Sequence, residues 1–261
     1  MSEDVLLVET LDSVARLTLN RPKAMNSLNF AMLAALKNQL NDIAANPKIR
    51  VVILTGSGPA FCAGADLKEV LKGQHNQPGE PDFLDCANLV FSQLRNFPKP
   101  VIAALNGITM AGGLELAMCA DIIVASNSAT IADAHANFGV YPGAGGAAIL
   151  PRLIPLNMAM YLLLTGKSLS ATEMKNLGLI CEVLPDDLLA TGALELASHI
   201  AKKSPIALSR MKQVARASSD KTREDALLHE QVMLRAHMRS FDFQEGLQSF
   251  TEKRKPNFQG R

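Results

Sequence analysis

The chain has 261 residues, of which 48% are hydrophobic and 20% charged, and its formal net charge is +1. This length and composition fit one large globular domain, or two small ones, with an ample core. No basic run is long enough to follow a phosphate backbone, and no run approaches the ~18 apolar residues of a membrane span. We therefore expect neither nucleic acid nor membrane as a partner.

Cysteine and histidine spacing argues against disulfides and metal sites. The four cysteines (Cys62, Cys86, Cys119 and Cys181) are far apart and form no Cys-x-x-Cys pair. The five histidines are scattered, with no His-Glu-x-x-His, so we expect free thiols, no metal and a reducing compartment. The acidic start Met-Ser-Glu-Asp differs from the basic start of a signal peptide, which predicts a cytoplasmic protein.

Hydrophobic periodicity predicts a hairpin, a helix and a buried strand in the first part of the chain. Two strand-like runs around a polar turn predict the hairpin over residues 4–20. A helix is predicted over residues 29–45, with Asn26 or Ser27 as its N-cap. The β-branched run Val51–Thr55 predicts the buried strand.

The middle of the chain continues with strands and helices in alternation. The polar stretch from Lys72 to Pro81 is predicted to be a mobile surface loop. A helix is expected over residues 83–96, followed by a buried strand at Val101–Leu105. Two short strands are predicted at Asp121–Ala125 and Thr130–Ala132.

The last third is predicted to be mostly helical. One strand is expected at Ile180–Leu184, Pro205 is expected to begin a helix, and Thr222 is expected to cap another. We predict an α/β core over residues 1–200 and a helical region over residues 201–261.

Candidate chemistry centres on the stretch from Ala104 to Asp121, which is predicted to be strand, loop, glycine pair and helix. The amide of Gly112 can stabilise an oxyanion, and the carboxylate of Glu115 can face the same point. Such a pair suits reactions that form an enolate next to a carbonyl. The alternative is that Gly112 and Gly113 only allow close helix–strand packing, with Glu115 a surface acid.

A second strand–loop–helix junction runs from Phe61 to Leu67, with the small residue Ala65 at a tight turn. Two amide donors from separate loops are what an oxyanion hole for a thioester carbonyl requires. Other familiar sites are excluded: Phe61 occupies a position where the dinucleotide fingerprint needs glycine, and there is no Gly-x-Ser-x-Gly elbow.

Six motifs, in order along nearly the whole chain, resemble the enoyl-CoA hydratase/isomerase family, the crotonase superfamily. They are Arg21-Pro22-Lys23-Ala24-Met25-Asn26-Ser27-Leu28, Phe61-Cys62-Ala63-Gly64-Ala65-Asp66-Leu67, the segment from Gly112 to Asp121, Pro142-Gly143-Ala144-Gly145-Gly146, Leu164-Thr165-Gly166, and the tail from Phe250 to Phe258. Each motif alone is weak, but their order and spacing together are specific.

The resemblance implies a crotonase-type spiral of repeated ββα units, with a C-terminal helical region that builds trimers, often paired into hexamers. It implies an acyl-CoA thioester as substrate and no separate cofactor, because coenzyme A is part of the substrate. The thioester oxygen would rest on the amides of Ala65 and Gly112. The CoA moiety would lie along Lys23, Ala24, Ala63, Asp66, Leu67 and Lys68, completed by Lys255 and Phe258 from the same or a neighbouring subunit. Lys255 has an alternative role as a solvated tail lysine.

Relatives that hydrate a trans-2-enoyl thioester use two glutamates around one water. Glu115 matches the first, but the second falls at His135, so this sequence departs from the pattern at a catalytic position. Imidazole is a competent acid or base near neutrality, and we predict hydration by Glu115 and His135. Either Glu115 takes a proton from water while His135 protonates the α-carbon, or the two roles are reversed. The alternative for His135 is a loop histidine bonded to a backbone carbonyl. Asp133 is predicted to point away, because its neighbour Ile131 indicates a strand.

Other reactions through the same enolate stay open as alternatives. These are double-bond isomerisation, decarboxylation and thioester hydrolysis. A catalytically silent CoA-binding homologue is a further possibility of a different class.

Overall fold

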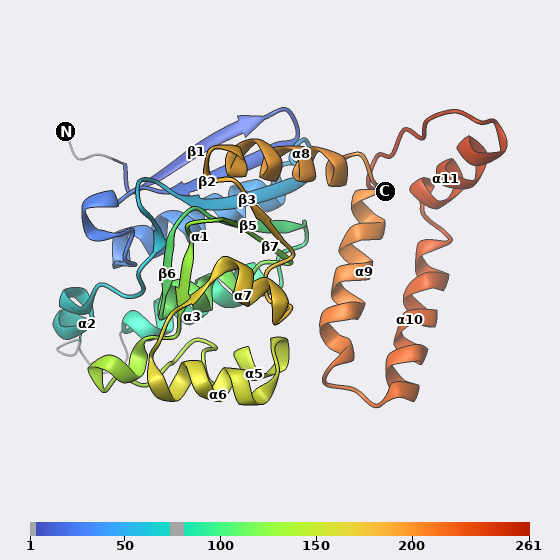
Figure 1. Ribbon diagram of the computed structural model, residues 1–261. Helices are drawn as coiled ribbons and strands as arrows, with labels where there is room; N and C mark the ends of the chain where they lie inside the picture. Colours follow the sequence, from blue (N-terminus) through green and yellow to red (C-terminus); the bar gives the residue numbers. More distant parts are fainter. Residues whose placement is uncertain (1–3, 74–80) are drawn as a thin grey trace.

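The computed structural model describes residues 4–73 and 81–261, which form two β-sheets surrounded by helices (Figure 1). The larger sheet has six strands in the order β1-β2-β3-β5-β7-β10, and the smaller has four in the order β4-β6-β8-β9. The strands are β1 (Leu6–Leu11), β2 (Val14–Leu19), β3 (Val51–Gly56), β4 (Ala60–Cys62), β5 (Val101–Leu105), β6 (Ile108–Met110), β7 (Ile122–Ser126), β8 (Thr130–Ala132), β9 (Leu169–Ser170) and β10 (Glu182–Leu184).

Successive strand pairs divide themselves between the two sheets. β3, β5 and β7 lie in the larger sheet, while β4, β6 and β8 follow them directly in the chain and lie in the smaller. Within each sheet these strands pair in parallel, so the chain must cross over after every pair. This is the predicted spiral of ββα turns.

Helices form the crossovers and cover the sheets. They are α1 (Phe30–Ala45), α2 (Leu67–Gly73), α3 (Phe83–Arg95), α4 (Gly112–Ala117), α5 (Leu150–Leu153), α6 (Leu156–Thr165), α7 (Ala171–Asn176), α8 (Leu189–Ala201), α9 (Pro205–Ser218), α10 (Arg223–His237) and α11 (Phe241–Thr251). Three short 3₁₀ helices are η1 (Pro22–Ala24), η2 (His135–Phe138) and η3 (Asp186–Leu188).

Apolar side chains pack on both faces of the larger sheet. On one face α8 contacts β2, β3, β5 and β7, and its buried residues Leu189, Ala193, Ala197 and Ala201 recur every four positions. Three alanines in this stripe let the helix lie close to the strands. The other face belongs to the main core, in which α1 packs against α3.

Most sequence-predicted elements are confirmed. The hairpin is the antiparallel pair β1–β2, and the strand at Val101–Leu105 is β5 with the same bounds. Ser204 caps the helix that Pro205 begins, and Thr222 caps α10 as expected.

Two local predictions need correction. The N-cap of α1 is Asn29, whose side chain accepts a hydrogen bond from the amide of Met32, whereas Asn26 is buried and serves another purpose. The predicted loop from Lys72 to Pro81 begins too early, because residues 72 and 73 belong to α2. Residues 74–80 of that loop lie outside the described part of the chain.

Helices α9–α11 extend from one side of the core, opposite α2 (Figure 1). The carboxylate of Asp121 ties α9 to the core through ion pairs with Lys212 (2.6 Å) and Arg216 (2.8 Å). Neither α9 nor α10 has a buried residue in the single chain. No helix in the described ranges combines the length and apolarity needed to span a bilayer.

Two asparagines fix the loops that lead into the smaller sheet. The buried Asn26 side chain donates to the carbonyls of Ser57 and Ala60 and accepts from the amide of Arg21. The side chain of Asn106 accepts from the amide of Gly56 and donates to the carbonyl of Ala60. Buried backbone groups need such partners, so these amides hold β4 in place.

Replacing Asn26 by Ala is expected to lower the free energy of unfolding by about 2–4 kcal/mol. The change removes three hydrogen bonds of a buried side chain, and it places alanine at a φ of 54°, where asparagine is tolerated better. Denaturant unfolding measures the loss. Asn38→Ala, on an exposed position of α1, is the matched control and should unfold like the wild type. Equal stability of Asn26→Ala and wild type would contradict this account.

Candidate active site

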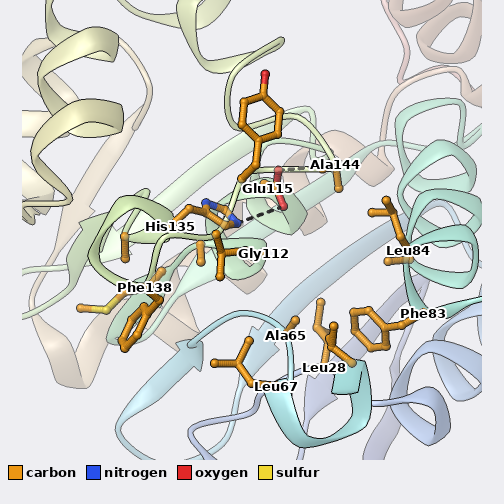
Figure 2. Close-up of a pocket in the computed structure, with 18 of the residues that line it drawn as sticks. Leu28, Ala65, Leu67, Phe83, Leu84, Gly112, Glu115, His135, Phe138 and Ala144 are labelled. Carbon is orange, nitrogen blue, oxygen red and sulfur yellow. Dashed lines mark hydrogen bonds and ion pairs between the residues drawn. The ribbon is translucent and has the colours of Figure 1, made fainter. Parts of the chain in front are cut away.

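A cavity of about 570 Å³ opens beside β6 and α4. Its lining comes mainly from the turn after β4 with the start of α2, the N-terminal part of α3, the junction of β6 and α4, and the stretch from Ala134 to Ala144. Its walls are mostly apolar, and Figure 2 shows Leu28, Leu67, Phe83 and Leu84 around the opening. The charged side chains among its lining residues are Asp82, Glu115 and His135.

The backbone amides of Ala65 and Gly112 lie next to each other in the cavity wall. A Cβ atom added to Gly112 would lie 3.4 Å from the nitrogen of Ala65. Gly112 is buried and Ala65 is partly buried, yet neither N–H group donates a hydrogen bond to any residue in the described ranges. Two unsatisfied donors directed at one cavity form a suitable site for a carbonyl oxygen that gains negative charge.

The turn at the start of α4 directs the Gly112 amide into this position. Ala111 has φ 49° and ψ −121°, a backbone conformation that costs a residue with a Cβ on the order of 1–3 kcal/mol. The strain is maintained because the surrounding backbone is fixed, with the Ala111 amide bonded to the carbonyl of Ala132 at the end of β8.

Gly113 allows close packing of helix α4 against strand β4, which is the alternative role considered above for both Gly112 and Gly113. A Cβ on Gly113 would lie 2.0 Å from the carbonyl oxygen of Cys62, so only glycine lets α4 approach β4 this closely. The same interpretation made Glu115 a surface acid, and this is wrong, because Glu115 is only 4% exposed.

The Glu115 carboxylate is held by the backbone of the loop after η2. Its Oε1 accepts hydrogen bonds from the amides of Ala144 (2.9 Å) and Gly146 (2.8 Å). Its Oε2 faces His135, whose Nε2 lies 4.0 Å away (Figure 2). The two backbone donors therefore fix one oxygen and leave the other directed at the imidazole.

His135 also contacts Asp133 through its other ring nitrogen. The Nδ1 atom lies 2.9 Å from Oδ1 of Asp133, whose side chain is buried. Burial lowers the pKa of His135, but the hydrogen bond to Asp133 and the charges of Asp133 and Glu115 outweigh it, and the pKa is raised above its ordinary value. The imidazole is therefore biased towards its cationic form.

The prediction that Asp133 points away from the site is wrong. β8 ends at Ala132, so strand alternation no longer governs residue 133. Ala134 then adopts a left-handed conformation with φ 58°, which turns the chain between Asp133 and His135. The glycine-rich motif Pro142-Gly143-Ala144-Gly145-Gly146 is apparent in the sequence, but nothing in it predicts that the amides of Ala144 and Gly146 bind Glu115.

Residues predicted to contact the CoA moiety divide into three groups. Ala63 and Leu67 line the cavity together with Ala65. Lys23 and Lys68 are exposed and Ala24 is partly exposed, whereas Asp66 forms an ion pair with Arg21 at 2.9 Å. Burial raises the pKa of Asp66, but the hydrogen bond and charge of Arg21 outweigh this and hold it below its usual value.

Lys255 and Phe258 are not brought to the cavity within one chain. The carbonyl of Phe258 accepts a hydrogen bond from Arg50, which directly precedes β3. Figure 1 places this C-terminal end beside α9 and away from α2, and none of the described residues of the tail lines the cavity. Lys255 is exposed on the same tail.

The buried thiols near the site are poor nucleophiles. Burial raises the pKa of Cys62 and of Cys119 to about 12, so neither forms a thiolate near neutral pH. Among residues 4–73 and 81–261, no group of three His, Cys, Asp or Glu side chains is arranged to hold a metal ion.

Comparisons with known proteins agree with this architecture. The family model described as "Enoyl-CoA hydratase/isomerase" matches residues 9–261. The crystal structure of an enoyl-CoA hydratase from Bacillus anthracis superimposes with a TM-score of 0.92 at 37% identity, over 98% of this chain and 100% of that one.

Curated relatives include both hydratases and isomerases. The 2,3-dehydroadipyl-CoA hydratase of Escherichia coli is 37% identical over the full length of both chains. The 1,2-epoxyphenylacetyl-CoA isomerase of the same organism is 35% identical, over 99% of each chain. With the spiral fold, the cavity and a match over nearly all its residues, this chain belongs to the enoyl-CoA hydratase/isomerase family of acyl-CoA enzymes.

Proposed function

We propose that this enzyme hydrates a trans-2-enoyl-CoA thioester, adding water across the double bond next to the carbonyl. The observation that supports this most directly is the 4.0 Å separation between His135 Nε2 and Glu115 Oε2 at the cavity. Two hydrogen bonds of about 2.8 Å can join atoms at this distance through one water molecule. Glu115 and His135 therefore suit a reaction in which water is deprotonated and a carbon atom is protonated.

The proposed reaction begins with the thioester oxygen bound by the N–H groups of Ala65 and Gly112. Glu115 takes a proton from water while the water oxygen bonds to C3, and the double-bond electrons move to the carbonyl to form an enolate. His135 then donates a proton to C2, and the enolate collapses to the thioester. Transfer of the proton from Glu115 to His135 through the next water restores both groups, so the atoms balance.

The amide pair is expected to contribute most of the rate enhancement. Removing one such donor typically costs about 3–4 kcal/mol of transition-state stabilisation. Acid–base catalysis by a positioned side chain contributes about 10²–10⁴-fold. The fixed backbone around Ala111 and Gly113 allows the donors to act without reorganisation when charge develops.

Glu115→Gln is expected to lower kcat for hydration of trans-2-hexenoyl-CoA by at least roughly 10²-fold. A glutamine oxygen still accepts from the amides of Ala144 and Gly146, so the fold is retained while the base is lost. Loss of absorbance of the conjugated thioester measures the rate, and mass spectrometry identifies the product as a hydrate.

Glu195→Gln is the matched control, because Glu195 is an exposed acid on α8. It should leave the rate unchanged. Full activity in Glu115→Gln would rule out the proposed base. A product of unchanged mass would instead indicate double-bond migration.

The acyl-binding part of the cavity suits an uncharged chain. Leu67, Phe83 and Leu84 are among its apolar lining residues, and the charged lining residue outside the Glu115–His135 pair is the acid Asp82. A carboxylate at the far end of a substrate would lose hydration there and meet a like charge. We therefore propose a neutral acyl group, in contrast to the adipyl derivative named for one relative.

For wild-type enzyme, kcat/KM is expected to be at least about tenfold higher for trans-2-hexenoyl-CoA than for 2,3-dehydroadipyl-CoA. Asp82→Asn keeps a residue that can cap α3. It should reduce the difference in kcat/KM between the two substrates, because it removes the negative charge that repels the substrate carboxylate. Competition between the two substrates, followed by mass spectrometry, gives the ratio directly. Equal turnover of both by wild-type enzyme would contradict a preference for neutral chains.

We propose that the enzyme assembles as a trimer, or as a pair of trimers, through its C-terminal helices. Helix α10 exposes Leu227, Leu228, Val232 and Leu234, an apolar surface typical of an interface. A neighbouring copy would then supply Lys255 and Phe258 to the CoA moiety, which the single chain does not do.

Light scattering after size exclusion is expected to give a mass three or six times that of the 28.0 kDa chain. Leu228→Glu together with Val232→Glu should lower this mass, because both place charge on the apolar surface. Lys37→Glu, on the exposed side of α1, should not. A monomeric wild-type protein would contradict the proposed assembly.

A further inference from the structure

Asp133 is a buried acid with an incomplete set of partners. It is 1% exposed, and Oδ1 lies 2.9 Å from His135 Nδ1, while Oδ2 has no hydrogen-bond partner in the described part of the chain. A Cβ added to Gly146 would lie 2.5 Å from Oδ2, so the backbone that holds Glu115 also closes over Asp133. Three segments thus converge on one small volume.

A carboxylate in this position requires a counter-ion. Burying an isolated charge is costly unless a partner of opposite charge compensates for it. Within residues 4–73 and 81–261, His135 is the group in contact with Asp133 that can carry positive charge. Contact through Nδ1 also fixes the ring, which leaves Nε2 directed at Glu115.

We propose that Asp133 is a positioning residue that keeps His135 as an imidazolium with its Nε2–H directed at the substrate. This assigns the roles of the pair: His135 is the acid that protonates C2, and Glu115 is the base. The assignment depends on the proposed hydration, but the Asp133–His135 interaction itself can be tested without turnover.

Few other charges face the imidazole. Helix α4 contributes Glu115, whereas β8 and the loop from Gly143 to Gly146 carry no titratable side chain. Helix α6, which packs against η2, carries only Tyr161. Asp82 and Tyr141 also line the cavity, and the cation Arg95 of α3 donates to the carbonyl of Ala144. The two carboxylates Asp133 and Glu115 therefore dominate the field at His135, and both favour its cationic form.

The sign of the pH dependence follows from these contacts. An acid must be protonated to act, so activity is lost as pH rises through the pKa of His135, which Asp133 and Glu115 raise despite the opposing effect of burial. Removing the charge of Asp133 lowers that pKa, and the alkaline limb of kcat/KM moves to lower pH. A role for Asp133 in structure alone would lower activity equally at every pH.

The test is Asp133→Asn, which keeps the size of the side chain and removes its charge. With trans-2-hexenoyl-CoA, kcat/KM is expected to fall roughly 10²-fold at about pH 8 and much less at about pH 6. Asp187→Asn, at an exposed acid of η3, should match the wild type throughout. In a His135→Gln background, Asp133→Asn should have little further effect, because Asp133 acts through His135.

NMR titration of the histidine rings gives a readout that does not need activity. The signal missing from His135→Gln identifies His135, and in wild-type protein it should titrate above the ordinary value of about 6.5. In Asp133→Asn it should titrate at lower pH. A wild-type value at or below about 6.5, or no shift in the variant, would overturn the proposal even if Asp133→Asn folds poorly.

These outcomes separate the two proposals. If wild-type enzyme hydrates no enoyl thioester, the proposed reaction fails while the titration still tests Asp133. If hydration occurs but the pH profile of Asp133→Asn parallels that of the wild type, the role of Asp133 is wrong and the reaction stands.

Discussion

The close approach of helix α4 to strand β4 is the contact on which the site depends. The carbonyl of Cys62 lies where a Cβ on Gly113 would be, so the two elements meet with no side chain between them. This approach brings the turn at Ala65 beside the amide of Gly112, although the two are far apart in the sequence. The Asn26 and Asn106 side chains hold β4 in place through hydrogen bonds to the carbonyl of Ala60. A rigid pair of donors is the result, and rigidity is what makes such donors effective.

Regular elements of this fold follow from local sequence, because hydrophobic period and breakers act over short distances. Val101–Leu105 is an apolar run after two prolines, and it forms β5 with the expected bounds. The three-residue strands β4 and β6 have too little sequence to show a period, and tertiary pairing defines them. Asn26 illustrates a further limit: an N-cap residue by type, it is instead buried among loop carbonyls that are distant in sequence.

The residues of the candidate site can be predicted from the sequence, but most of the contacts between them cannot. Ala65, Gly112, Glu115 and His135 were identified from strand–loop–helix junctions and from motif resemblance, and all four line one cavity. The sequence predicts that Asp133 points away from the site only if the alternation of strand side chains continues one residue past the end of β8, and it does not. Its contact with His135 depends on the left-handed turn at Ala134, a conformation that alanine adopts rarely and that its sequence does not signal.

The net charge of the site links His135, which stands where the family pattern has a glutamate, to the neighbouring acid Asp133. In the two-glutamate pattern expected from the resemblance, two carboxylates around one water share a proton, and the pair carries a net charge of about −1. If histidine alone replaced the second glutamate, the carboxylate and the imidazolium would have zero net charge. Such a pair would attract a proton from water less strongly than a pair with a net charge of −1. In the proposed arrangement the carboxylate of Asp133 adds one negative charge, and the group of Glu115, His135 and Asp133 returns to −1. In the proposed reaction the aspartate and the histidine therefore act together: the histidine supplies the proton, and the aspartate provides the negative charge that the second glutamate would otherwise supply.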